Sequence, residues 1–172
     1  MWENTVITNA GLEMLSGMLA GEKVKISSVK SGAGAVDVSE LRNQTEVITP
    51  KQTAAIQGLE KNGDFIQLSV LFTNQGLTTS YGMRQIGVYV QGEDQKDILF
   101  AISQSNTAKE IPSGMVTPWY SLLHHLKFQF KNDIGMEAVI NPAGLVSMEE
   151  YRNTVERVNT LERKRFLALK GY

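Results

Sequence analysis

The two histidines of the chain, His124 and His125, are the first candidates for catalysis or metal binding. They are adjacent in a segment where apolar and polar residues alternate, which predicts a β-strand. Neighbouring residues of a strand point to opposite faces of the sheet, so these two imidazoles are badly placed to hold one ion. We therefore expect His124 to be a hydrogen-bonded core residue, and we expect no metal site.

Acidic and glycine-rich segments give no stronger sign of catalysis. The carboxylates available for glycoside hydrolysis fall at predicted hairpins, strand starts or exposed positions, where solvated turn residues are common: Glu46, Asp64, Asp133 and Glu137. The Ser-Gly-Ala-Gly segment at 31–34 is not followed by the Lys-Ser or Lys-Thr pair of a phosphate-binding loop. The chain also has no Gly-x-Ser-x-Gly elbow. The sequence therefore predicts no enzyme and no cofactor.

An aromatic pair, Trp119 and Tyr120, follows Pro118. Flat aromatic faces pack against the C–H faces of sugar rings, so this pair is a candidate glycan contact, which Tyr81 and Tyr89 could extend. Packing in the core or at a protein interface is the other interpretation of these residues. The sequence leaves both open.

The composition is that of an ordinary globular domain with an appendage. The 172 residues are 42% hydrophobic, and a net charge of −1 is too small to attract nucleic acid or anionic lipid. Without cysteines, stability must come from packing or oligomerisation. The first five residues lack the features of a signal peptide, and no apolar run approaches the roughly 18 residues that span a bilayer. We expect a protein made in a reducing cytoplasm, with no membrane insertion.

A capped helix followed by a strand is predicted for the first thirty residues. Thr8 or Asn9 can accept backbone N–H bonds at the first turn, and Gly21 can end the helix. The helix is expected to pack on the following sheet through one apolar face, made of Leu12, Leu15, Met18 and Leu19.

The rest of the domain is predicted to be mostly β. Residues 31–49 look like a long surface loop with one helical turn around Leu41. After it come six or seven alternating runs, and the Asn62-Gly63 pair between two of them is a strong hairpin signal. The predicted fold class is α+β, with an N-terminal helix packed on a mainly antiparallel β-sandwich.

A second helix is predicted from Ser147 to the C-terminus, because Ser147 and Glu150 have the spacing of a capping box. Its apolar residues form a narrow seam that we assign to an oligomer interface: Met148, Tyr151, Val155, Val158 and Leu169. Two interpretations stay open, since the seam can dock on its own domain or pair with copies in a short trimeric coiled coil. The sequence thus predicts a domain at 1–146 and an oligomerisation or fibre-joining helix at 147–172.

Three segments together resemble the N-terminal domain of bacteriophage tail-collar and tail-fibre proteins, which also occurs in phage-tail-like bacteriocins. They are the helix-then-strand opening at 7–32, the run Tyr-Gly-Met-Arg-Gln-Ile-Gly-Val-Tyr at 81–89, and Ile-Asn-Pro-Ala-Gly-Leu-Val-Ser at 140–147. The resemblance implies a homotrimeric structural protein of the virion, whose N-terminal domain fastens a fibre to the baseplate of the tail.

The family commonly continues into a long shaft and a receptor-binding tip, whereas this sequence stops at Tyr172. We therefore expect an adaptor that joins the baseplate to a separate fibre or receptor-binding protein. A carbohydrate-binding β-sandwich that contacts the host surface is the main alternative, and an enzyme that trims cell-wall glycans comes third. Nucleic acid is not expected as a partner.

Overall fold

The computed structural model describes residues 2, 4–20, 24–63, 65–92, 94, 96–129, 136–138 and 160. The chain divides into two units, Met1–Ile140 and Asn141–Tyr172. Thr160 is the one described residue of the second unit, so the architecture is that of the first. The predicted domain boundary at residue 146 stays a prediction.

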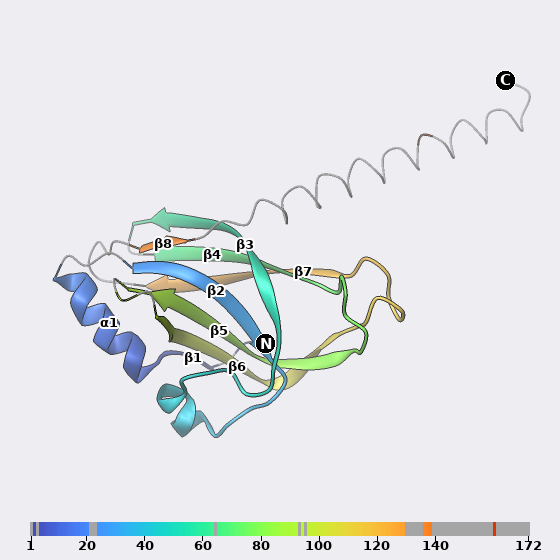
Figure 1. The fold of residues 1–172 in the computed structure, drawn as a ribbon, viewed down its shortest axis with the longest axis horizontal. Coiled ribbons are helices and arrows are strands. Elements are labelled where there is room, and N and C mark those ends of the chain that lie inside the picture. Colours follow the sequence, from blue (N-terminus) through green and yellow to red (C-terminus); the bar gives the residue numbers. More distant parts are fainter. Residues whose placement is uncertain are drawn as a thin grey trace, which may run out of the picture. The chain divides into compact units, whose positions relative to one another are not determined.

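The described part of the first unit is β-rich and mainly antiparallel, with few helices. Its elements in chain order are β1 (Asn4–Ile7), α1 (Asn9–Leu19), β2 (Val24–Gly32), the 3₁₀ helix η1 (Val38–Asn43), β3 (Pro50–Asn62), β4 (Phe65–Thr73), β5 (Tyr81–Gln91), β6 (Asp97–Ile111), β7 (Ser121–Gln129) and β8 (Met136–Ala138). The strands form one sheet in the order β1-β6-β5-β2-β3-β4-β7 (Figure 1). β8 pairs in parallel with β2, while the other pairs are antiparallel.

This sheet is strongly curled, which corrects the predicted sandwich of two separate sheets. β3 makes the sheet continuous, because its first residues, 50–54, pair with β2 and its later residues, 55–62, pair with β4. Phe100 of β6 and Phe128 of β7 meet edge to face at a ring-centroid distance of 6.4 Å, although four strands separate β6 from β7 in the sheet order. The main core therefore lies inside the curl.

The alternation of apolar and polar residues along β4 correctly predicted which of its side chains face the main core. The apolar residues of β4 predicted to share one face are all buried: Ile66, Leu68, Val70 and Phe72. The predicted Asn-Gly hairpin connects β3 to β4, and Gly63 has a φ of 59°, a conformation that glycine adopts without steric cost. A repeat of two residues was enough to predict the buried face of β4, because the side chains on its opposite face are less completely buried.

Helix α1 docks on β6 where the pairing of β6 with β5 is irregular. The register skips Phe100, and the Phe100 carbonyl accepts a hydrogen bond from the Thr8 backbone N–H at 3.0 Å. Thr8 is fully buried and caps α1, since its hydroxyl oxygen accepts from the Gly11 N–H at 3.0 Å. A Cβ at Gly11 would lie 2.1 Å from the Phe100 carbonyl oxygen, so this approach requires glycine.

The face of α1 that meets the sheet differs from the predicted one at Leu12. Met18 is buried and Leu15 packs partly buried against the core, but Leu12 is 39% exposed. Gly11 points to the sheet, and neighbouring residues of a helix are turned by about 100°, which directs Leu12 away. Apolar spacing missed this contact because glycine has no side chain to mark it. The side chain of Leu19 lies outside the described residues.

Residues 33–49, which we call the cover segment, lie against the outer face of the sheet. They were predicted as a long surface loop with one helical turn from which Leu41 packs down, and both the turn, η1, and the burial of Leu41 are present. The cover segment and the strands beneath it form a second, smaller core from Leu41, Val47, Tyr89, Leu99 and Ile102. Tyr89 alternates along β5 with Val88 and Val90 of the main core, so the two cores occupy opposite faces.

Candidate interaction surface

The tip loop, residues 112–120, connects β6 to β7 and is fastened to the support loop, residues 74–80. Asn74 is 3% exposed, and its Nδ2 donates to the carbonyl oxygens of Pro112 at 3.1 Å and Thr117 at 2.6 Å. Three backbone N–H groups add bonds between the loops: Ser113 to Ser80 Oγ at 2.8 Å, Gly114 to Leu77 O at 3.2 Å, and Asn74 to Tyr120 O at 3.2 Å. The backbone of the tip loop is therefore held from several directions.

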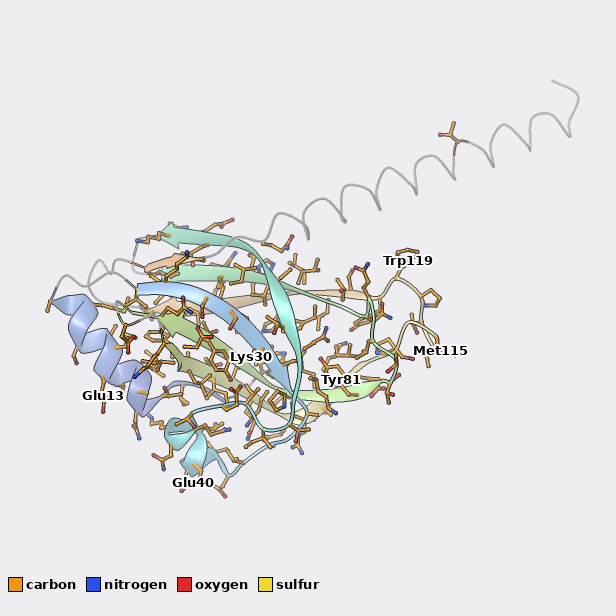
Figure 2. The ribbon with its side chains drawn as sticks, viewed as in Figure 1. Glu13, Lys30, Glu40, Tyr81, Met115 and Trp119 are labelled. Atoms are coloured by element: carbon orange, nitrogen blue, oxygen red, sulfur yellow. The ribbon has the colours of Figure 1, made fainter. Side chains whose placement is uncertain are left out.

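This fastened loop exposes large apolar side chains and contains no charged residue. Met115 is 90% exposed, Val116 is 70% exposed and Trp119 is 82% exposed. Trp119 has a φ of 62°, a left-handed conformation that is uncommon for a residue with a Cβ. Figure 2 shows Met115 and Trp119 at the end of the first unit that lies away from α1. The sequence offered the aromatic pair as a signal but gave no sign of Met115 and Val116.

Of the aromatic residues considered for sugar stacking, Trp119 is the exposed one. Tyr120 turns inward and packs partly buried against the main core, and this burial raises its pKa. Tyr81 and Tyr89 are buried. The predicted glycan contact by Trp119 and Tyr120 stays a prediction, in which Trp119 offers the exposed ring and Tyr120 a partly buried one.

The two histidines point to opposite faces of β7, as predicted. His124 is half-buried, and its ring meets Trp2 edge-on at a centroid distance of 5.5 Å. Burial lowers the pKa of His124, and repulsion from His125 lowers it further. His125 is exposed, with its Nδ1 2.9 Å from Ser69 Oγ. The two imidazole rings are therefore not placed to contact the same ligand.

A buried glutamine cluster joins the cover segment to β5 and β6. The Nε2 group of Gln85 donates to the side-chain oxygens of Gln44 at 2.9 Å and Gln104 at 2.7 Å, and its own Oε1 accepts from the Ile48 N–H at 2.7 Å. Gln104 also bonds both backbone groups of Val36, at 3.0 and 2.8 Å. Every polar group of Gln85 is used, so this cluster holds the fold together. Its sequence signal is a glutamine beside Arg84 in a mostly apolar strand.

Tyr89 has a strongly perturbed pKa, a property that often marks an active site. Burial raises its pKa first, and the hydrogen bond from its hydroxyl to the Glu46 carboxylate raises it further. The same hydroxyl accepts from the Val47 N–H at 3.1 Å. Lys30 Nζ lies 4.2 Å from the Tyr89 ring centroid and 3.4 Å from Glu46 Oε2. The protonated phenol donates to Glu46 and accepts from Val47, and these two bonds fasten the cover segment to β5.

The other candidates for chemistry are engaged elsewhere or lie outside the described residues. The N–H groups of Ala33 and Gly34 donate to backbone carbonyls at 3.0 Å each, so neither group is available to bind a phosphate. In the described part of the chain, no three His, Asp or Glu side chains gather to hold a metal ion. Two of the considered acidic residues, Asp64 and Asp133, and the side chain of Glu137 are not described.

The predicted oligomer interface also lies outside the described residues, and it stays a prediction. This applies to Met148, Tyr151, Val155, Val158 and Leu169. Among the residues that are described, no helix has the length and apolar character needed to cross a membrane.

Comparisons with protein-family models, curated proteins and solved structures found no match to this chain.

Proposed function

We propose that this chain is a structural component of a phage or phage-like tail, which attaches a tail fibre or receptor-binding protein to the baseplate. The proposal includes a non-enzymatic role, a place in the assembled particle after synthesis in the bacterial cytoplasm, and a homotrimer. The predicted helix at 147–172 supplies the coiled coil that holds three copies together and joins the fibre. Its partners are baseplate and fibre proteins, with no cofactor, nucleic acid or membrane involved.

One observation carries the proposal: residues in the segments that resemble the tail-fibre family make the long-range contacts that build this domain. Thr8 and Gly11 of the opening dock α1 on β6. Within the run at 81–89, Gln85 and Tyr89 hold the cover segment on the sheet. These contacts make the two described segments of the resemblance structural parts of the domain. The role in attachment rests on the resemblance itself.

The proposal is tested by deleting the gene for this chain from the genome that encodes it and purifying the tail particles. We expect baseplates that lack the fibre or receptor-binding protein, and restoration when the unaltered chain is supplied. Mass spectrometry of the particles measures both outcomes. Particles that keep their full set of fibres without the chain, or a genome that makes no tail particles, would contradict the proposal.

A carbohydrate-binding module is the second candidate function, and the 82% exposure of Trp119 is the observation that favours it. A flat indole face in solvent can stack on a sugar ring. Binding of the purified chain to a glycan array, lost in Trp119→Ala, would support this alternative. Retained binding in that variant would remove Trp119 as its basis.

A further inference from the structure

We propose that the tip loop is an anchor that inserts Met115, Val116 and Trp119 into an apolar pocket of a second protein in the tail particle. This inference rests on the proposed function, and it identifies both the attaching surface of this chain and the chemistry of the partner site. The tip loop lies away from α1 in the first unit, so α1 remains free of the contact (Figure 2).

The tip loop already has a fixed conformation before a partner binds. Asn74 bonds two of its carbonyl groups, and backbone bonds from Ser113 and Gly114 reach the support loop. Ordering such a loop on binding costs little conformational entropy, which increases the affinity that its side chains can supply. The positive φ of Trp119 supports the same conclusion, because strained residues persist where surrounding contacts fix them and gather at binding sites.

The exposed area of the tip suits insertion into a pocket. One aromatic side chain buries about 150–250 Å², so Trp119 with Met115 and Val116 offers roughly 400–500 Å². A standard protein interface takes about 800 Å² from each partner. The three side chains alone therefore supply roughly half of one partner's share of a standard interface. A tryptophan fully desolvated in a pocket, in contrast, is a typical binding hot spot.

The chemistry of the tip favours a protein partner over a sugar. The tip loop carries no charge and presents Trp and Met, the composition of the core of a protein interface. A sugar site also needs polar groups beside the aromatic face. The nearby polar side chains of Asn74 and Ser80 are already bonded to the tip-loop backbone, so Thr117 is the exposed polar side chain that the tip loop offers.

The experiment measures binding of the full-length chain to tail particles assembled without it. Trp119→Gly removes the ring and relieves the positive φ, so this variant is expected to fold at least as stably as the unaltered chain. Met115→Ala removes the second anchor. Phe65→Ala is the matched control, because Phe65 is a 47% exposed aromatic at the other end of β4, roughly 26 Å from Thr73.

We expect Trp119→Gly to bind the particles at least about 30-fold more weakly, Met115→Ala to bind about tenfold more weakly, and Phe65→Ala to bind unchanged. Oxidative footprinting of the unaltered chain should show Met115 and Trp119 protected on the particle and reactive in the free chain. Unchanged binding by Trp119→Gly would overturn the inference and leave the proposed function standing. Failure of the unaltered chain to bind the particles would overturn both.

Two further results would assign the tip to another occupant and overturn the inference. The first is a fall in the oligomeric mass of the free chain in Trp119→Gly, because this would place a second copy of the chain at the tip. The second is protection of Trp119 from oxidation by a host oligosaccharide or by phosphatidylcholine vesicles at the level that the particle gives.

Discussion

Gly11 is the residue where a single added carbon should do most harm to the attachment of α1. We expect Gly11→Ala to lower the free energy of unfolding by about 3 kcal/mol, because the new Cβ meets the Phe100 carbonyl oxygen and forces the helix off the sheet. Chemical denaturation measures the change. Gly58→Ala is the control, since a Cβ there has no neighbour within 4 Å. Equal stability of the two variants would contradict the docking described for α1.

His124 gives the stability of the protein a pH dependence of known sign. Its pKa is lower in the folded chain than its ordinary value of 6.5, so the unfolded chain binds the proton first as the pH falls. Stability contributed by neutral His124 is therefore fully present above about pH 6.5, and it is lost as the pH falls below that value toward the lower pKa of the folded state.

Thermal unfolding between pH 5 and 8 checks this expectation. His124→Phe should give a flatter dependence of the melting temperature on pH, while the ring contact with Trp2 is kept. His125→Gln is the matched control and should keep most of the dependence, because it removes the minor cause of the shift. Identical pH profiles for the two variants would show that His124 does not titrate as described.

At the scale of elements, the cover segment is held on the sheet partly by Gln85 of β5. Gln85→Met has a similar length but leaves the Ile48 N–H and two glutamine side chains without their buried partner. We expect a loss of about 2–3 kcal/mol and faster tryptic cleavage after Arg42 within η1. Gln75→Met, at an exposed turn, should show neither effect. Protection of Arg42 that is unchanged in Gln85→Met would contradict this role.

Local sequence patterns predicted elements better than they predicted the pairing of elements. The buried face of β4 and the Asn62-Gly63 turn depend on residues close together in the sequence. Both could therefore be predicted from the spacing of residue types. The curl arises because β3 changes partner along its length, and this depends on strands far away in the chain. β1 and β8 have four and three residues, too few for a periodic signal.

The candidate site shows the same division between local and distant information. Trp119 was recognisable by residue type. Its exposure depends on Asn74, which lies 45 positions earlier in the sequence and bonds the tip loop. Met115 and Val116 would normally be assigned to a core. Only the pairing of the tip loop with the support loop shows that these side chains stay in solvent.

For the whole molecule, the proposed trimer depends on the seam of the predicted C-terminal helix. Val155→Asp combined with Val158→Asp places unpaired charges in that seam and should lower the oligomeric mass, at a cost of several kcal/mol per trimer. Light scattering measures the mass. Asn153→Asp combined with Asn159→Asp adds the same charge outside the seam and should leave the mass unchanged. If the double valine variant also keeps its mass, the helix is not the assembly device.

The parallel pairing of β8 with β2 has a mechanical consequence. β8 is the last described strand of the first unit, and it joins β2, the middle strand of the sheet, through three residue pairs that end at Ile26 and Ala138. A pull on the chain beyond Ala138 therefore reaches the sheet first through these few hydrogen bonds and the buried side chain of Met136. The short ladder should rupture before the longer ones, so that tension lengthens the tether by several residues while the rest of the domain stays folded.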